Sequence, residues 1–314
     1  MIDVQTEDDL QDTLYHYTDF AVLQSIWENA EVWATNARYL NDITETRVGP
    51  GLVQGVLLNR ELATAGEIIA FTERLRQQGV AGDEPLPPSD ADALRELYEN
   101  RAFYREIRMA FDYSIISGNC FIFSLSKEPD QLSQWRAYAK DGVCIGFSTE
   151  VLRDSLSAAR ADRAYLKSVE YPGTSADPAD ISDPIIEFMR NRRDELIAEG
   201  CDDVNIRNVE IGREILMRVA FLKHAKFEEE KEVRVAVQGN PNHFTPNRYG
   251  IVPRMKLPLN PHAIRSVMVG PGAHTDLRVQ SLRTYLDERG FGEDLGALGA
   301  EVELFRSSIP YRDW

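Results

Sequence analysis

The spacing of apolar residues predicts an alternation of short buried strands and amphipathic helices. Continuous apolar runs of strand length at residues 120–124 and 143–147 are typical of strands covered on both faces. Shorter or alternating patterns predict further strands at residues 14–18, 32–34, 166–171, 233–237, 250–257, 264–269 and 301–305. Helical spacing is found at residues 20–27, 46–78, 92–114, 132–139, 183–225 and 276–289.

The order of these elements predicts an α+β fold, because irregular helical segments separate the strands and no regular βαβ series appears. We expect one domain over residues 1–314, with helical insertions at about 46–118 and 178–225. The Pro-rich acidic stretch 79–91 reads as a loop or hinge inside the first insertion.

The chain of 314 residues has a formal net charge of −16, which argues against non-specific nucleic-acid binding. Five basic residues fall on one predicted helical stretch, where a solvated helix face is favoured over a basic groove: Arg207, Arg213, Arg218, Lys223 and Lys226. The start of the chain is acidic and lacks a signal-peptide pattern, and no apolar run approaches the roughly 20 residues of a membrane span. A cytoplasmic protein without a membrane partner is the expectation.

The three cysteines are far apart, and no Cys/His spacing typical of a zinc site occurs, so neither a metal site nor a disulfide framework is expected. Cys120 and Cys144 read as small core residues. Rossmann and P-loop glycine patterns are missing from the sequence, as are the HExxH and GxSxG motifs.

His16 and Thr18 are two residues apart on a predicted strand, so their side chains share one face. An imidazole and a hydroxyl on one face suit hydrogen bonds to ribose, and the neighbouring rings of Tyr15 and Tyr17 can stack on a nicotinamide or adenine. The alternative is a histidine at the edge of the core, bonded to a backbone carbonyl.

Glu232 begins a late strand in which Glu232, Arg234 and Ala236 alternate with valines. A carboxylate at the end of a strand can accept a bond from a ribose 2′-hydroxyl and stabilise a developing oxocarbenium ion. Arg234 can orient the Glu232 carboxylate through a charge-assisted bond, which lowers the nucleophilicity of that carboxylate. A run of acids such as residues 228–232 is otherwise a solvated face.

Two further segments supply candidates for the site. In the polar loop 36–42, Arg38 or Asn41 could reach the phosphates or ribose of NAD, or the loop could be an ordinary turn. In the short helix 132–139, Trp135 reads as core, whereas Gln134, Arg136 and Tyr138 could form a cleft wall with Ser124. The turn at residues 270–272 reads as a strand-to-helix connection rather than an anion site.

These motifs resemble those of a large bacterial family catalogued as a domain of unknown function. The likeness runs along nearly the whole chain, through segments 14–18, 41–45, 123–138, 142–147, 169–171, 226–234, 269–271 and 308–312. The chain is also remotely similar to ADP-ribosyltransferases of the His-Tyr-Glu type, which hold NAD with a His-x-Thr strand and a late strand headed by Glu.

This second resemblance implies a split, ADP-ribosyltransferase-like sheet and cleavage of the nicotinamide–ribose bond of NAD, which is a substrate. It implies catalytic roles for Glu232, His16 and Tyr138, with Tyr17 as the alternative to Tyr138 for the middle aromatic. The predicted binding residues are His16, Tyr17, Thr18, Arg38, Asn41, Ser124 and Arg136. The acceptor of ADP-ribose is a protein, a nucleic acid or water, as in a toxin or antiphage effector. The alternative is an inactive nucleotide- or ligand-sensing module that acts through a protein partner.

Overall fold

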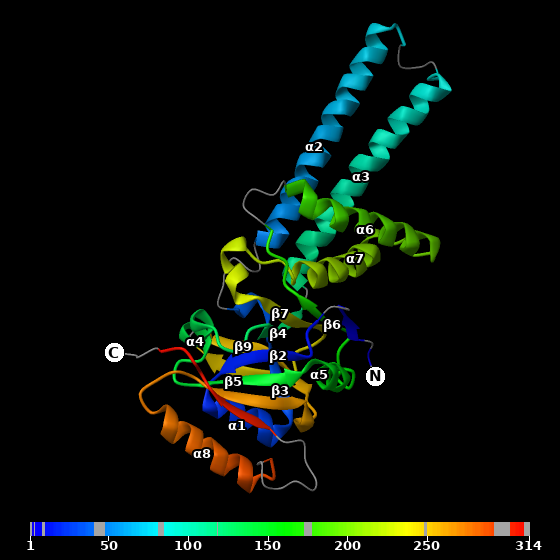
Figure 1. Ribbon diagram of the computed structural model, residues 1–314. Helices are drawn as coiled ribbons and strands as arrows, with labels where there is room; N and C mark the ends of the chain where they lie inside the picture. The colour runs from blue at the N-terminus through cyan, green and yellow to red at the C-terminus, as the bar shows by residue number, and fades with distance from the viewer. Residues whose placement is uncertain are drawn as a thin grey trace. The chain divides into compact units, whose positions relative to one another are not determined.

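The computed structural model describes residues 2, 4–7, 10–40, 48–80, 85–117, 119–172, 178–247, 250–291 and 302–310. The chain forms two compact units, which we call the sheet unit and the helical unit (Figure 1). The sheet unit consists of residues 1–43, 119–171 and 223–314, and the helical unit of residues 44–118 and 172–222. The architecture is α+β, as the sequence predicts.

The sheet unit contains eleven strands among its described residues: β1 (Val4–Thr6), β2 (Thr13–Thr18), β3 (Glu31–Asn36), β4 (Cys120–Ser126), β5 (Val143–Ser148), β6 (Arg163–Ser168), β7 (Glu232–Gln238), β8 (His243–Asn247), β9 (Gly250–Pro258), β10 (Ile264–Val269) and β11 (Glu303–Arg306). Its α-helices are α1 (Phe20–Asn29), α4 (Leu132–Tyr138), α5 (Thr149–Leu156) and α8 (Thr275–Glu288). Its short 3₁₀ turns are η1 (Ala37–Tyr39), η2 (Ala225–Glu230) and η3 (Pro261–Ala263).

The strands form one mixed sheet with the order β1-β6-β7-β4-β2-β5-β10-β11, and β3 joins it by pairing with β4 and β9. Only β1–β6 and β10–β11 are parallel pairs in this described sheet. Strand β4 pairs with β7 through seven residues and β2 pairs with β5 through six, whereas β2 and β4 share the single pair Tyr15↔Ser126. The sheet therefore consists of two halves that meet at one rung.

One face of this sheet carries the hydrophobic core, built mainly from alternate residues of the central strands and from α1, α5 and α8. Helix α1 shows why its sequence folds this way. The Asp19 side chain caps the helix by accepting from the Val22 N–H at 2.7 Å. The apolar positions Leu23, Ile26 and Trp27 then lie on one buried face.

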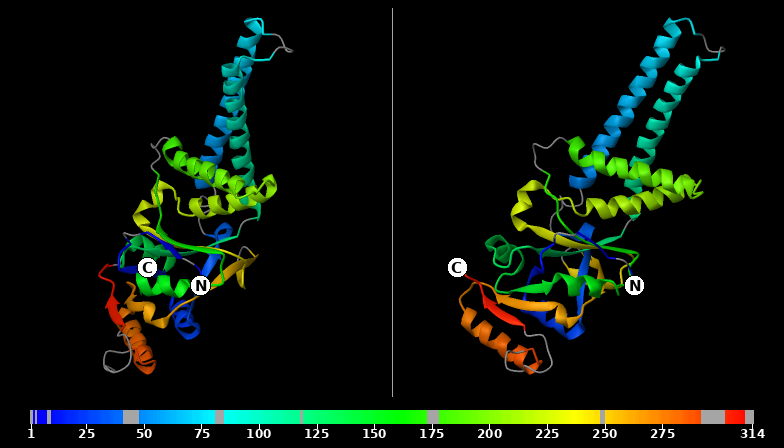
Figure 2. Two further views of the ribbon diagram at one scale, coloured as in Figure 1. Left: turned by 90° about the vertical axis from the view of Figure 1, so that its right-hand side faces the viewer. Right: turned by 45° about the vertical axis from the view of Figure 1, so that its right-hand side comes forward.

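The helical unit contains α2 (Val48–Gln77), α3 (Pro88–Ser117), α6 (Pro178–Ala198) and α7 (Val204–Val219). Both views of Figure 2 show α2 and α3 running side by side as a long pair. The hydrophobic core of the helical unit includes Leu57 of α2, Phe103 of α3 and Ile215 of α7. Buried Glu106 in α3 is bound by Arg193 at 2.8 Å and by Arg207 at 3.0 Å, so a buried ion cluster joins α3, α6 and α7.

The structure confirms the main predicted strands and helices and adds β1, β8 and α5, which the sequence interpretation missed. Helix α3 begins at Pro88, inside the predicted loop 79–91, because proline fits the first position of a helix. Cys120 and Cys144 are buried, as predicted. In the part of the chain that the structure describes, no helix is both long and apolar enough to cross a bilayer.

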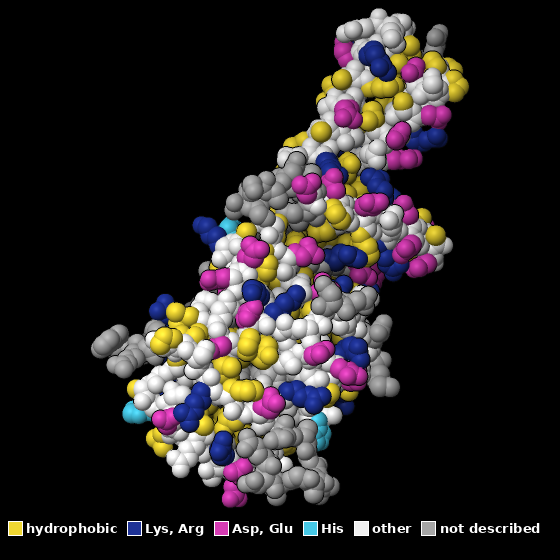
Figure 3. Space-filling model, viewed as in Figure 1, with side chains coloured by type: hydrophobic (Ala, Val, Ile, Leu, Met, Phe, Trp, Pro, Cys, Tyr) yellow, Lys and Arg dark blue, Asp and Glu magenta, His cyan; other side chains and the backbone are white. Residues whose placement is uncertain are grey.

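The prediction that the basic residues 207–226 form a solvated helix face is wrong for two of them. Arg207 is buried against Glu106 in α7. Lys223 lies beyond the end of α7 and is 2% exposed, in an ion cluster described below. On the face drawn in Figure 3, acidic and basic side chains of the described residues are interspersed over both units.

The turn after β10 should tolerate no side chain at Gly270. A Cβ there would lie 2.8 Å from the ring atoms of Trp135, which is 2% exposed and cannot retreat. We expect Gly270→Ala to lower the unfolding free energy by about 1–3 kcal/mol. Urea unfolding followed by tryptophan fluorescence measures this.

The matched control is Gly66→Ala in α2, where the added Cβ meets nothing within 4 Å. Alanine favours a helix interior by about 1 kcal/mol over glycine, so this variant should keep or gain stability. Equal unfolding free energies for Gly270→Ala and the unmodified protein would contradict the packing described for Trp135.

Candidate functional site

Strand β7 carries two charged residues in the interior of the sheet unit. It lies between β4 and β6, and all seven of its residues are buried. Glu232 is 5% exposed and Arg234 is 1% exposed. The acids before β7 were candidates for a solvated face, but Glu232 is not part of one.

Glu232 and Arg234 belong to a cluster of four charges. Arg234 binds the carboxylate in a bidentate way, with Nε 2.8 Å from Oε1 and Nη2 3.0 Å from Oε2. The Lys223 ammonium lies 3.1 Å from Oε2 of Glu232 and 2.8 Å from Oε2 of Glu230. The described contacts thus pair two cations with two anions, and the predicted charge-assisted bond from Arg234 to Glu232 is confirmed.

The cluster keeps Glu232 ionised. Burial by itself would raise the pKa of this carboxyl, but the charge and hydrogen bonds of Arg234, the charge of Lys223 and the Ser124 hydroxyl together lower the pKa below its ordinary value. A carboxylate of this kind is a poor proton acceptor, and it is suited to stabilising positive charge.

The backbone of Glu232 is held as firmly as its side chain. Its N–H donates to the Tyr171 hydroxyl at 2.8 Å, and its carbonyl accepts from the Val169 N–H at 2.9 Å. Burial raises the pKa of Tyr171 to about 12, so the hydroxyl stays neutral. The preceding residue, Lys231, has a φ of 44°, a left-handed conformation that residues other than glycine seldom adopt.

His16 lies in the gap where the two halves of the sheet separate. Its Nδ1 is 2.9 Å from the carbonyl oxygen of Ser124, and its ring centroid is 4.6 Å from that of Phe123. A carbonyl only accepts, so Nδ1 carries the proton. Desolvation lowers the pKa of His16 despite this bond, which favours the neutral ring.

The strand register places His16 and Glu232 on opposite faces of the sheet. Ser126 is paired with both Tyr15 and Glu232, and directly paired residues lie on the same face. The side chain of His16 therefore points to the other face, toward Phe123. His16 and Glu232 therefore do not face one another, because a one-residue offset along a strand reverses the face.

Ser124 nevertheless lies between the two predicted residues. Its carbonyl accepts from the imidazole of His16 at 2.9 Å. Because a backbone carbonyl lies roughly in the plane of the sheet and a side chain points out of it, one residue can face partners on both sides. The Ser124 side chain lies on the Glu232 face, where its hydroxyl is one of the groups that lower the pKa of Glu232.

Two other candidates on β2 are interior residues. Thr18 is 7% exposed and is paired with Val143. Tyr17 donates to the Glu128 carbonyl at 2.8 Å, accepts from the Gln131 N–H at 3.0 Å and packs edge-on against Trp135. The predicted stacking of nicotinamide on Tyr17 is wrong for this structure, because that ring is 5% exposed and is enclosed by its partners.

The remaining candidates lie at the surface. Tyr138 and Arg136 are exposed on α4, and Arg38 is exposed in η1. Gln134, a predicted cleft residue, is instead 7% exposed, and Trp135 is core as predicted. Asn41 lies outside the described residues.

The sequence interpretation missed the partners that hold the site together. Lys223 and Tyr171 both bind Glu232, and the Ser126 hydroxyl donates to the Glu230 carbonyl at 2.9 Å. The Asp130 carboxylate accepts from Trp135 Nε1 at 2.8 Å and from the Ser308 N–H at 2.7 Å, which ties the loop after β4 to the C-terminal segment. Such long-range pairs leave no local pattern.

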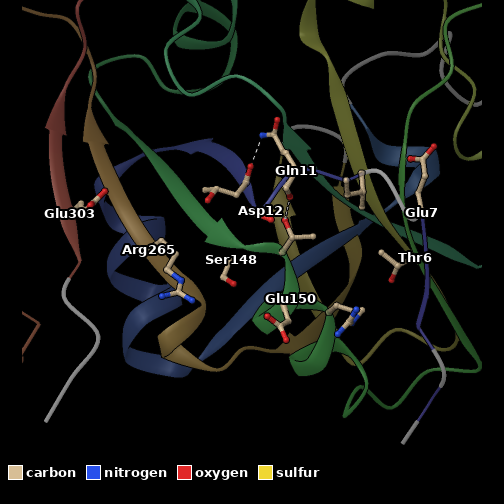
Figure 4. Close-up of a pocket in the computed structure, with 12 residues that line it drawn as sticks. Thr6, Glu7, Gln11, Asp12, Ser148, Glu150, Arg265 and Glu303 are labelled. Atoms are coloured by element: carbon tan, nitrogen blue, oxygen red, sulfur yellow. Dashed lines mark hydrogen bonds between the residues drawn. The ribbon is translucent and has the colours of Figure 1, made fainter.

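A polar pocket of about 760 Å³ lies elsewhere on the sheet unit (Figure 4). Its charged lining comprises four acids and two arginines: Glu7, Asp12, Glu150, Glu303, Arg153 and Arg265. The excess of carboxylates disfavours a pyrophosphate, so we do not assign the pocket to NAD. Among the described residues, no group of three or more His, Cys, Asp or Glu side chains is arranged to hold a metal ion.

The fold and site define an α+β protein with a buried four-charge cluster at the head of a central strand. Residues 134–235 match the model of a family described as "Protein of unknown function (DUF2971)". The matched segment runs from α4 to β7 and includes Tyr171, Lys223, Glu232 and Arg234. No curated protein and no solved structure matches the chain.

The ion cluster predicts a distinctive dependence of stability on pH. The pKa of Glu232 is lower in the folded than in the unfolded protein, so its charge contributes stability that is present above the ordinary pKa of 4.5. That stability is lost as the pH falls through the folded pKa. In Glu232→Gln the unfolding free energy should therefore decline less steeply below pH 4.5, as urea titrations at several pH values measure.

At neutral pH the same substitution should lower the unfolding free energy by about 3–5 kcal/mol, because it leaves buried cations uncompensated. The control is Glu228→Gln, an exposed neighbour in η2 that should keep the stability and pH dependence of the unmodified protein. Parallel pH profiles for the unmodified protein and Glu232→Gln would show that Glu232 is not held as described.

Proposed function

We propose that the sheet unit is an NAD-cleaving enzyme of the ADP-ribosyltransferase type. The observation that carries the proposal is the buried, ionised Glu232 at the head of β7, with Ser124 of β4 lying between it and His16 of β2. A His-x-Thr strand and a late strand headed by Glu are the two elements by which the sequence resembles that class. In the fold they are separated by β4 alone.

The state of Glu232 suits the proposed chemistry. In the reaction, the bond between nicotinamide and C1′ of ribose breaks, and its electron pair leaves with neutral nicotinamide. The ribose that remains has oxocarbenium character, which an ionised carboxylate stabilises. Water or an acceptor nucleophile then adds to C1′ and loses a proton. Glu232 acts by charge and by accepting from the 2′-hydroxyl, not as a base.

His16 serves this site from the opposite face of the sheet. Its neutral ring donates to the Ser124 carbonyl and so helps to place Ser124, whose hydroxyl contributes to the lowered pKa of Glu232. The exposed residues Arg38, Arg136 and Tyr138 are accessible to solvent and remain our candidates for contacts to the dinucleotide. The acceptor of ADP-ribose, whether a protein, a nucleic acid or water, is left to experiment.

A second function is favoured by one observation. The Glu232 carboxylate accepts twice from Arg234 and once from Lys223, and a carboxylate has about four acceptor positions. A buried carboxylate with most of its acceptor positions filled by cations is typical of a structural ion cluster. The runner-up is therefore a catalytically inactive nucleotide- or ligand-sensing module that signals to a protein partner.

Nicotinamide release from NAD by the purified protein tests the proposal. We expect release by the unmodified protein and a fall of about 10²–10³-fold in Glu232→Gln, the loss typical when one preorganised electrostatic group is removed. Glu228→Gln, which keeps the cluster intact, should retain turnover. Labelled NAD added to cell lysate then identifies the acceptor.

Calorimetry with NAD separates the two functions. Binding without nicotinamide release, with similar affinity in Glu232→Gln, would support the sensing module and reject the enzyme. Neither binding nor release by a folded protein, with and without lysate, would reject NAD as the ligand.

A further inference from the structure

The two residues that border the second segment of the helical unit both bind Glu232. Tyr171 is the last residue of the sheet unit before residues 172–222, and Lys223 is the first residue after them. The Tyr171 hydroxyl accepts from the Glu232 N–H, and the Lys223 ammonium binds Oε2 of the carboxylate. The entry and the exit of this segment therefore converge on one residue of the candidate site.

The two ends are also joined to each other. The Lys223 N–H donates to the Glu170 carbonyl at 3.0 Å, and the Val169 N–H donates to the Glu232 carbonyl at 2.9 Å. Residues 169–171, 223 and 232 thus form one hydrogen-bonded junction within the sheet unit. Residues 172 and 222, the two ends of the helical segment, are each one peptide bond away from a residue that binds Glu232.

Lys223 is the donor on Glu232 that is best placed to leave. Arg234 lies in the same strand as Glu232, two residues away, and holds it through two bonds. Lys223 makes one bond to Glu232 at 3.1 Å and a shorter one, at 2.8 Å, to Glu230. Its ammonium also lies 4.8 Å from the ring centroid of Phe227. Glu230 and Phe227 therefore remain as partners of Lys223 when its bond to Glu232 is broken.

We propose that Lys223 is an inhibitory latch on Glu232 and that the helical unit controls its release. With the latch closed, the ammonium occupies an acceptor position that a ribose hydroxyl needs and weakens the negative field of the carboxylate. With the latch open, Arg234 still orients Glu232, and Oε2 can accept from the substrate. The inference rests on the proposed function and specifies how that same site is regulated.

The first test is the rate of nicotinamide release in Lys223→Gln, which removes the charge but keeps a hydrogen-bond donor. We expect kcat to rise at least threefold, whereas Lys223→Arg, which keeps the charge, stays near the unmodified protein. A residue with a merely structural role would lower kcat in both variants. A fall or no change of kcat in a folded Lys223→Gln protein therefore overturns the latch.

The second test is hydrogen exchange in the full chain, with NAD as the probe. If NAD opens the latch, its binding should alter exchange in the peptide that covers α7 and residues 220–222 in the unmodified protein. The same change should be absent in Lys223→Gln, in which the latch is already open. Changes confined to the sheet unit and identical in both proteins would overturn the control by the helical unit.

Exchange also tests the latch if the protein does not act on NAD. Glu232→Gln removes the charge that holds Lys223, so exchange should rise more in residues 204–222 and in η2 than in α8, which reports the general loss of stability of the sheet unit. Glu228→Gln should leave all three unchanged. Unaltered exchange in residues 204–222 of Glu232→Gln overturns the latch, whereas absent NAD binding overturns only the proposed function.

Discussion

The compensation of charge inside the sheet is the constraint on which the rest of the sheet unit depends. Strand β7 is covered on both faces, a position in which apolar residues are normal. Glu232 and Arg234 break that rule, and an uncompensated buried ion costs several kcal/mol. Lys223 and Glu230 must therefore lie against the strand, which determines the path of the chain from residue 223 to residue 232.

Stability alone does not account for such a cluster. Replacing a buried ion pair by apolar residues of similar size is often neutral, or stabilising by about 1–4 kcal/mol. A chain that needed only a stable β7 would do as well with valine at these positions, as it does at Val233, Val235 and Val237. Under the proposed function, the charges instead serve to keep Glu232 ionised at the head of the strand.

The incomplete pairing of β2 and β4 has a similar consequence. Backbone groups that leave a ladder need other partners when they are buried. Beyond the rung Tyr15↔Ser126, the carbonyl of Ser124 finds its partner in the ring of His16. The separation of the two halves thus creates the need for a side-chain donor at His16. The same separation leaves Ser124 in contact with residues on both faces.

The sequence predicts the strands and the contacts between near neighbours in this arrangement, but few of the contacts between residues that are distant in the chain. The runs 120–124 and 143–147 predict buried strands because every residue is apolar or small, and a spacing of two puts Arg234 beside Glu232. The face on which His16 lies relative to Glu232 depends on register across β4, which no local pattern encodes. Tyr17 illustrates a further limit, since an aromatic residue beside a polar one can stack on a ligand or fill the core.

Lys223 and Tyr171 escape sequence reasoning for a different reason. Each contacts at least one partner that is distant in the sequence. Each also borders an inserted segment, and the sequence alone does not show where that segment begins and ends. An insertion can be placed at any surface loop with little effect on the core. Here both border residues, Tyr171 and Lys223, bind Glu232 instead. Coupling between two sites is reciprocal, so under the proposed latch a ligand that draws Glu232 away from Lys223 also biases the helical unit, and a partner of the helical unit biases Glu232. The borders of the insertion then matter to the site as well as to the fold, because each of them contacts Glu232.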